Sequence, residues 1–90
     1  MTTMIVQHGV ADYAVWRPIF DGHGASRDQH GCTSVSIYRG VDDPNAITAV
    51  MDFPSAANAK AFASDPSLKE AMSKAGVTGP PQITFVESAG

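Results

Sequence analysis

The longest amphipathic pattern in the chain begins at Asp12 and ends at Gly31. Asp12 is a suitable N-cap residue, and Gly31 is suited to ending a helix. At about 3.6 residues per turn, side chains separated by 4, 3, 4 and 3 positions share one helical face. The residues with this spacing are Trp16, Phe20, His23, Arg27 and His30. The pattern therefore predicts a helix whose inward face carries two imidazoles and a guanidinium among aromatic rings.

Three residues weaken this predicted helix. Pro18 removes one backbone hydrogen bond, so we expect either a short turn over 12–17 with a main helix from 18, or one helix bent at Pro18. Gly22 and Gly24 each lower helix propensity by up to about 1 kcal/mol relative to alanine. They also leave little bulk beside His23.

Three segments in the first half of the chain have the pattern of β-strands. Residues 3–8 are mostly apolar, which predicts a strand buried on both faces. Residues 33–39 alternate between an apolar face and a polar face that carries Tyr38. An Asp-Pro turn within 42–45 leads to a third strand over 46–53, so the second and third strands should form an antiparallel hairpin.

The second half of the chain predicts a helix in two pieces and a final strand. Ser55 is a suitable cap for an alanine-rich helix over 56–63. An Asp-Pro pair at 65–66 starts another helix, which Gly76 ends. Residues 82–87 are predicted to form the last strand.

The order β-α-β-β-α-β is typical of an α+β, ferredoxin-like fold. Such a fold has a four-stranded antiparallel sheet with helices on one face, and here the second helix is split in two. Residues 1–90 contain no repeat, linker or low-complexity segment, so we expect a single domain. The sheet face without helices needs cover. Two such sheets meeting face to face would provide it, and we therefore expect a homodimer.

Composition excludes several classes of function. The net charge is −3 and the six Lys and Arg residues are scattered, so we expect no nucleic-acid partner. No apolar run approaches the length of a membrane span, and the N-terminus lacks the regions of a signal peptide, so we expect no membrane association. The single cysteine, Cys32, cannot form an internal disulfide and suits a reducing compartment. These features favour a cytoplasmic protein.

His23 and Arg27 are the candidate catalytic residues. Burying such groups without partners costs several kcal/mol, so their inward position indicates a pocket. His23 could act as an acid or base near neutrality, or it could be a core histidine bonded to a carbonyl or carboxylate. Arg27 could stabilise a carboxylate, phenolate or enolate, or it could form an ion pair with Asp28, Asp52 or a carboxylate at a subunit interface.

Five further residues are candidate substrate contacts, and four of them have a structural alternative. Trp16 and Phe20 would form an aromatic wall for a flat ligand, or would pack in the core. His30 would contact the ligand, or would interact with the helix dipole at the C-terminus. His8, near the end of the first strand, could reach the same pocket. Tyr38 could donate a hydrogen bond to a substrate oxygen or lie at the dimer face.

The sequence predicts neither a metal site nor a cofactor. His23 and His30 would be about 10 Å apart along a helix, too far to bind one ion. HxH, HxxxH and CxxC motifs are absent, and Gly22-His-Gly24 is not a nucleotide-binding glycine motif. Cys32 has no activating base nearby in the sequence, so we interpret it as a small packing residue.

Three segments resemble a known superfamily. They are DYAVWRPIFDGH at 12–23, YRGVDDPN at 38–45 and LKEAMSKAGVTGPP at 68–81. Together they resemble small stand-alone bacterial proteins of the dimeric α/β-barrel superfamily, labelled cyclase-like or antibiotic-biosynthesis-monooxygenase-like. The resemblance covers nearly the whole chain. It implies two sheets packed face to face and a pocket between the helices and the sheet of each subunit. Members include polyketide cyclases, cofactor-free quinone-forming monooxygenases and haem-degrading enzymes.

One hypothesis and two alternatives follow. The hypothesis is a small cofactor-independent enzyme that cyclises or oxygenates an aromatic or polyketide-like molecule, with His23 as acid or base and Arg27 as anion stabiliser. The first alternative is a non-catalytic dimeric module that binds a small hydrophobic ligand or a partner protein. The second is haem binding and degradation through one imidazole. The Asn, Trp and His set of the haem-degrading relatives has no counterpart in this sequence.

Overall fold

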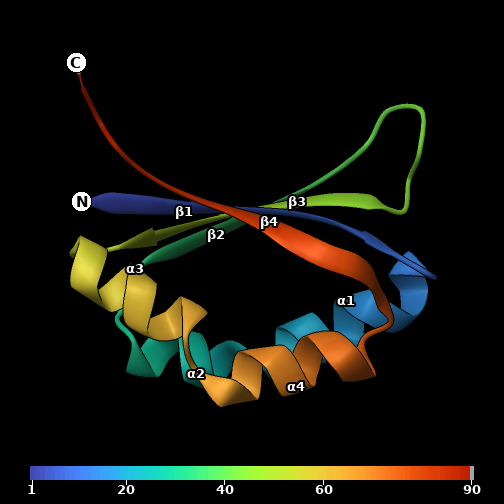
Figure 1. The fold of residues 1–90 in the computed structure, drawn as a ribbon, viewed down its shortest axis with the longest axis horizontal. Helices are drawn as coiled ribbons and strands as arrows, with labels where there is room; N and C mark the ends of the chain where they lie inside the picture. The colour runs from blue at the N-terminus through green and yellow to red at the C-terminus, as the bar shows by residue number, and fades with distance from the viewer. Residues whose placement is uncertain (90) are drawn as a thin grey trace.

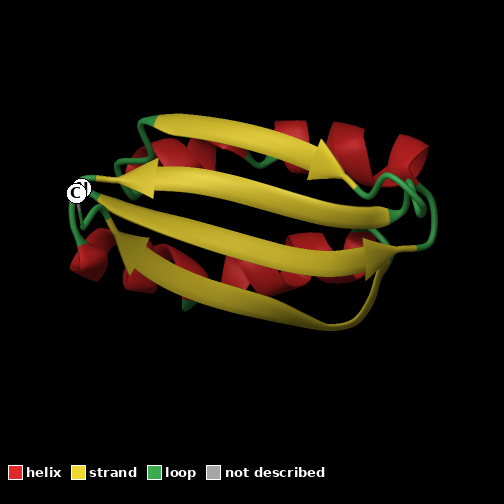
Figure 2. Ribbon diagram, turned by 90° about the horizontal axis from the view of Figure 1, so that it is seen from above, coloured by secondary structure: helices red, strands yellow, loops and turns green. Residues whose placement is uncertain are grey.

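The computed structural model describes residues 1–89 and has two layers, a sheet and a layer of helices. One antiparallel sheet has the strand order β2-β3-β1-β4, and the helices all cover the same face of it (Figures 1 and 2). The predicted ferredoxin-like fold is therefore confirmed. The strands are β1 (Thr2–Val10), β2 (Ser34–Arg39), β3 (Ala46–Phe53) and β4 (Val77–Glu87). The helices are α1 (Tyr13–Gly22), α2 (Gly24–Gln29), α3 (Ala56–Ala63) and α4 (Pro66–Lys74).

The predicted long helix is interrupted at His23, not at Pro18. Pro18 lies within the continuous helix α1, whereas His23 separates α1 from α2 with φ −89° and ψ 8°. The predicted separate turn over 12–17, with a main helix starting at 18, is therefore wrong. The two glycines that flank His23 explain the break, because glycine gains no side-chain packing in a helix and loses the most backbone entropy there.

Gly31 ends α2 as predicted. Its φ of +82° is a left-handed conformation that glycine adopts without steric cost. The Cys32 N–H donates to the carbonyl of Arg27, five residues earlier, at 3.0 Å. This hydrogen bond is typical of a helix that ends at a glycine in the left-handed conformation. A Cβ on Gly31 would also lie 3.3 Å from the ring of Pro54. The turn from α2 into the sheet therefore depends on glycine at this position.

Two predictions about the strands are wrong. Strand β4 starts at Val77, five residues earlier than predicted, and passes through Pro80 and Pro81 with a register shift opposite His8. Prolines fit there because β4 is an edge strand with one neighbour. In its irregular segment, not every residue has to donate an N–H group to a neighbouring strand. Strand β1 is buried on its helix-facing side alone: Gln7 on the other side is exposed.

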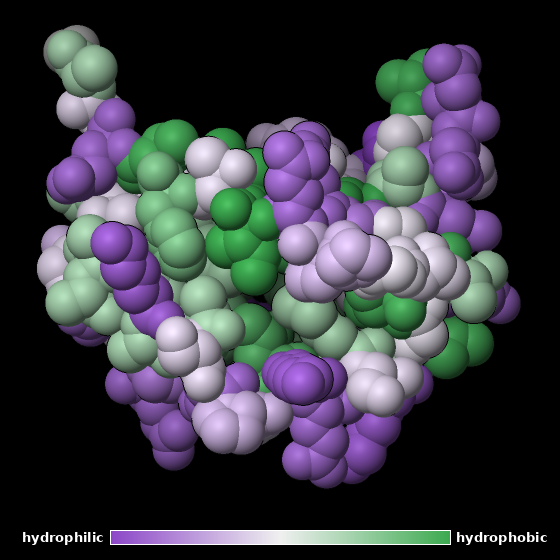
Figure 3. Space-filling model, viewed as in Figure 1, coloured by the Kyte–Doolittle hydropathy of each residue, from purple (hydrophilic) through white to green (hydrophobic). Residues whose placement is uncertain are grey.

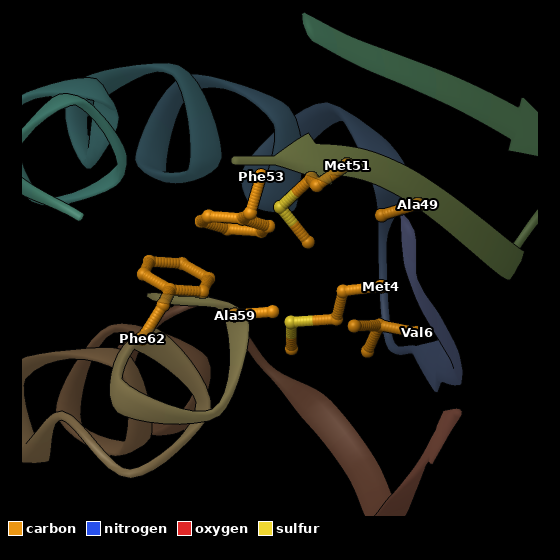
Figure 4. Packing of buried hydrophobic residues seen from close by; sticks show 7 residues of the cluster. All are labelled: Met4, Val6, Ala49, Met51, Phe53, Ala59 and Phe62. Carbon is orange, nitrogen blue, oxygen red and sulfur yellow. The ribbon is translucent and has the colours of Figure 1, made fainter. Parts of the chain in front are cut away.

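The core lies between the sheet and the helices. Its largest cluster joins Met4 of β1, Phe53 of β3 and Phe62 of α3, and Figure 4 shows both phenylalanine rings pointing toward each other across this layer. The ring centroids of Phe53 and Phe62 are 5.6 Å apart. Full burial of such a side chain stabilises a fold by about 1.5–3 kcal/mol. A second cluster contains Val10, Trp16, Ile47 and Ala75.

The split of the second helix is confirmed. The side chain of Ser55 accepts a hydrogen bond from the Asn58 N–H at 3.2 Å and begins α3. Asp65 begins α4 in the same way, accepting from the Ser67 N–H at 2.9 Å. Each helix within residues 1–89 falls short of the length and hydrophobicity that a membrane crossing requires.

Candidate functional site

A small cavity of about 40 Å³ lies between the helices and the sheet. Met4 and Met51 form its floor on the sheet, and residues of α1, α2, α3 and α4 close the other sides. Figure 3, viewed as Figure 1, shows hydrophobic atoms gathered in the middle of this face and hydrophilic atoms along its lower edge, over the helices. A cavity of this size holds a few water molecules, since one water needs roughly 10–15 Å³. Ordinary ligand pockets are roughly 300–1,000 Å³.

The structure brings together most of the residues that the sequence predicts for the site. Five of them line the cavity: His8, Trp16, Phe20, His23 and Arg27. The inward face predicted for the first helix therefore survives the break between α1 and α2 as far as Arg27.

Tyr38 and His30 are not among the residues that line the cavity. Tyr38 pairs with Thr48 on the sheet face opposite the helices and is 58% exposed. Strand alternation explains this position, because Tyr38 follows the inward-facing Ile37. His30 lies beyond the helix break, and its Nε2 is 2.9 Å from Asp65 Oδ2. Their predicted contact with a substrate has no support in this geometry.

Trp16 and Phe20 form one aromatic wall of the cavity. Their rings stack with centroids 4.9 Å apart and an interplanar angle of 26°. His8 meets the Trp16 ring edge-on at 5.7 Å, and burial lowers the pKa of His8 below its usual value. This wall is flat and apolar, which suits an aromatic ligand. Trp16 also belongs to the second core cluster, so this residue both packs in the core and lines the cavity.

Arg27 places a buried positive charge at the cavity. The side chain is 8% exposed, and its guanidinium carbon lies 4.0 Å from the centroid of the Phe20 ring. Its Nη1 donates to the backbone carbonyl of Phe20 at 2.9 Å. No carboxylate forms a salt bridge with Arg27 within residues 1–89. Burial lowers the pKa of Arg27, but a guanidinium stays charged at neutral pH. The predicted ion pairs with Asp28 or Asp52 are absent from the described part of the chain.

His23 lies at the edge of the cavity and is half-buried. Its Nε2 is 3.0 Å from Ser67 Oγ, so the ring is oriented by a hydroxyl of α4. Burial and the nearby charge of Arg27 lower the pKa of His23 below its usual value near 6.5. A neutral imidazole therefore prevails at neutral pH, which is the form that accepts a proton.

A chain of hydrogen-bonding side chains connects His23 to the start of α4. Ser67 Oγ lies 3.3 Å from Ser26 Oγ, and Ser26 donates to Asp65 Oδ2 at 3.4 Å. His30 completes the chain at the same carboxylate oxygen, and this contact holds the pKa of Asp65 well below its usual range. Sequence reasoning did not assign Ser26 and Ser67 to the site. They are about forty residues apart in the chain, and local spacing carries no information about that contact.

Other reactive groups do not form a metal or nucleophilic centre. Residues 1–89 contain no cluster of three or more His, Cys, Asp or Glu side chains placed to hold a metal ion. Burial raises the pKa of the Cys32 thiol, and its Sγ donates to the carbonyl of Ser34 at 3.4 Å. Cys32 is therefore protonated at neutral pH. It packs against the core, which agrees with its interpretation as a small packing residue.

Comparisons with known proteins find similarity in structure. No protein-family model matches the sequence, and a search of curated proteins finds no match. Among solved structures, SnoaB of Streptomyces nogalater, a cofactor-independent oxygenase, superposes with a TM-score of 0.79 at 13% identity, covering 99% of this chain and 93% of that chain. An antibiotic biosynthesis monooxygenase gives 0.76 at 13% identity, covering 100% of both chains.

A third structure, Rv0793 from Mycobacterium tuberculosis, gives a TM-score of 0.75 at 15% identity over 99% of this chain and 95% of that chain. At such low identity, similarity over whole chains establishes the fold and leaves the chemistry to the site itself. The predicted resemblance is confirmed at that level: this chain has the fold of an antibiotic biosynthesis monooxygenase and of the cofactor-independent oxygenase SnoaB.

Proposed function

We propose that this protein is a cofactor-independent enzyme acting on an aromatic or polyketide-like small molecule. It removes a proton from an acidic C–H or O–H group of the substrate and stabilises the anion that forms. The observation that carries this proposal is the pair formed by His23 and Arg27. A neutral imidazole and a buried guanidinium without a carboxylate partner line the same apolar cavity.

The two residues have complementary roles in this reaction. His23 accepts the proton, and Arg27 attracts the enolate or phenolate oxygen on which the negative charge develops. The apolar surroundings strengthen this attraction, because charges interact more strongly where water is excluded. The stacked rings of Trp16 and Phe20 support the flat part of the substrate that enters the cavity.

We propose oxygenation as the reaction that follows proton removal, with molecular oxygen as co-reactant. SnoaB, which has the same fold, is described as a cofactor-independent oxygenase. With anthrone as a model substrate, the carbanion forms a C–O bond with dioxygen, and loss of water gives anthraquinone. One oxygen atom enters the product and the other leaves as water, so anthrone and dioxygen give anthraquinone and water. The same proton removal would also start an aldol-type cyclisation.

Substrate binding requires the cavity to widen beyond its present 40 Å³. Met4, Met51 and Met72 line the cavity, and unbranched methionine side chains repack easily around a ligand. Helix α4 contains no fully buried side chain, whereas α1 and α3 each contain at least one, so α4 is held less tightly to the core. These features support a cavity that opens when a ligand enters.

The second candidate function is the non-catalytic module. It is favoured by the small volume of the cavity and by the protein partners that His23 and Arg27 already have, Ser67 and the Phe20 carbonyl. The haem alternative has less support, because Ser67 and Asp65 engage the Nε2 atoms of His23 and His30 that an iron would require.

An oxygen electrode and the absorbance of anthraquinone would test the enzymatic proposal with anthrone as substrate. We expect His23→Gln and Arg27→Met each to lower kcat by about 10²-fold or more, as removal of a general base or an anion-stabilising donor does. Arg17→Met is the matched control, since Arg17 is 42% exposed and pairs with Asp21. Wild-type protein that does not accelerate anthrone oxidation above the spontaneous rate would support the non-catalytic module instead.

We also propose that two copies pack through their uncovered sheet faces. This face carries Ile5 and Val50, which lie side by side in the register of β1 and β3, and the exposed Val86 of β4. The helices cover only the opposite face of the sheet (Figure 2). A second sheet would remove these apolar side chains from water.

A further inference from the structure

A groove of about 220 Å³ opens on the outer surface between α1 and α4. These helices lie side by side beneath the sheet (Figure 1). Three of the residues that line the groove also line the inner cavity: Ile19, His23 and Ala71. The groove and the cavity are therefore separated by the same three side chains, and His23 is reached from both sides.

We propose that this groove is the entrance to the site and its outer half, and that it holds the body of an elongated aromatic anion. The anionic end of the ligand passes His23 and reaches Arg27, while the remaining rings lie between α1 and α4. This inference rests on the proposed function, and it adds the route, the orientation of the ligand and the residues that limit its width.

Volume is the first argument for a ligand that occupies both spaces. An apolar cavity that binds benzene has a volume of roughly 150 Å³. The inner cavity, at about 40 Å³, is too small for one aromatic ring, whereas the groove, at about 220 Å³, has room for one. A polycyclic ligand therefore extends into the groove when its inner end reaches the cavity.

Charge is the second argument, and it gives the ligand a direction. At the rim of the groove, Lys74 Nζ lies 3.1 Å from Glu70 Oε1, so these opposite charges offset each other. Arg27, without a carboxylate partner in residues 1–89, lines the cavity and not the groove. The anionic group of the ligand is therefore attracted inward, and the part that stays in the groove is uncharged.

Gly22 and Ala71 limit the width of the groove. A Cβ built on Gly22 has no atom within 4 Å, so this position faces open space, and its backbone does not require glycine. Ala71 stands between the groove and the cavity with a side chain of one carbon. A larger side chain at either position would occupy the path of the ligand.

The test uses anthraquinone-2-carboxylate as the probe and the fluorescence of Trp16, the single tryptophan of the chain, as the readout. Stopped-flow quenching gives the association rate for the wild type and for Gly22→Leu and Ala71→Leu. We expect both variants to bind about tenfold more slowly or more, because a narrowed entrance lowers the association rate. Ala25→Leu, at an exposed position of α2 that lines neither space, should match the wild type.

The outcomes separate this inference from the proposed function. If the wild type binds the probe and both leucine variants bind it at the wild-type rate, the groove is not the entrance. The proposed function of the inner cavity is not affected by that result. If the probe does not quench Trp16 in the wild type, this inference is overturned, and the anthrone assay decides the proposed function separately. Thermal unfolding shows whether each variant is folded. Should Ala71→Leu fail to fold, Gly22→Leu decides, since its side chain enters open space.

Discussion

The charge of Arg27 acts on the protonation of His23, because both side chains line one small, mostly apolar cavity. Burial is the larger cause of the low pKa of His23, and the guanidinium of Arg27 is the second. Asp65 opposes both by favouring the charged imidazole. Burial and Arg27 together therefore keep His23 neutral, which is the form that the proposed proton transfer requires, and Arg27 is also the residue proposed to stabilise the anion that forms.

We predict that Arg27→Met raises the pKa of His23 toward its ordinary value, while Arg27→Lys, which retains the charge, changes it less. A base is active above its pKa, so activity falls as pH drops through the pKa of His23, which lies below 6.5 in the wild type. In Arg27→Met this decline should begin at higher pH. An NMR titration of the His23 imidazole measures the shift independently of activity. An unchanged His23 pKa in Arg27→Met would contradict the assigned coupling.

Sequence periodicity predicted part of this site, for a clear physical reason. His23 and Arg27 are one helical turn apart, and local spacing sufficed to place both inward with Trp16 and Phe20. Ser67 contacts His23 across a separation of 44 residues, which no local pattern encodes. His30 belongs to the same predicted stripe but pairs with Asp65, because the break at His23 separates it from α1.

At the scale of elements, side-chain caps determine where the short helices α3 and α4 begin. Helix α3 has eight residues, so its propensity alone gives little stability and its end contacts matter. Ser55 satisfies one free N–H at the start, and Asn58 then donates to the carbonyl of His30 at 3.0 Å. The start of α3 is thereby attached to the end of α2.

We predict that Ser55→Ala lowers the free energy of unfolding by about 1 kcal/mol, because the Asn58 N–H loses its side-chain acceptor. Ser73→Ala is the control: Ser73 is exposed within α4 and should change stability by less than about 0.5 kcal/mol. Urea unfolding followed by circular dichroism measures both variants. Equal stability of the two variants would show that the cap contributes nothing.

The elements themselves could largely be predicted, and their boundaries less well. Alternation and helical spacing predicted all four strands and the split second helix, because one face of each element packs on the core. The break at His23 could not be predicted from local propensity, because proline costs a helix more than glycine does. The early start of β4 was missed because edge strands tolerate the prolines that central strands exclude.

At the scale of the whole molecule, one side of the sheet is covered and the other is not (Figure 2). Asp52 accepts hydrogen bonds from Ser34 and from Thr3 on the uncovered face, and these contacts lower the pKa of Asp52. The apolar Ile5 and Val50 lie beside this polar group. A mixed face of this kind is compatible with a dimer interface that has an apolar centre and a polar rim.

We predict that the wild type sediments as a dimer and that Val50→Asp is a monomer, because a charge at the centre of the uncovered face would be buried without a partner. Val41→Asp is the control, since Val41 lies in the loop before β3 and is fully exposed. Analytical ultracentrifugation measures the mass of each protein. A wild-type monomer, or a Val50→Asp dimer, would contradict packing through this face.

The most direct measurement of the proposed Arg27-centred site compares two probes of nearly equal shape and different charge. Trp16 fluorescence is titrated with anthraquinone-2-carboxylate and with neutral 2-(hydroxymethyl)anthraquinone, in the wild type, Arg27→Met and the exposed control Arg17→Met. We predict that the wild type and Arg17→Met bind the carboxylate at least about tenfold more tightly, or about 1.4 kcal/mol, and that Arg27→Met loses this preference. Equal affinity of the wild type for both probes, or a preference that persists in Arg27→Met, would show that Arg27 does not hold the anion.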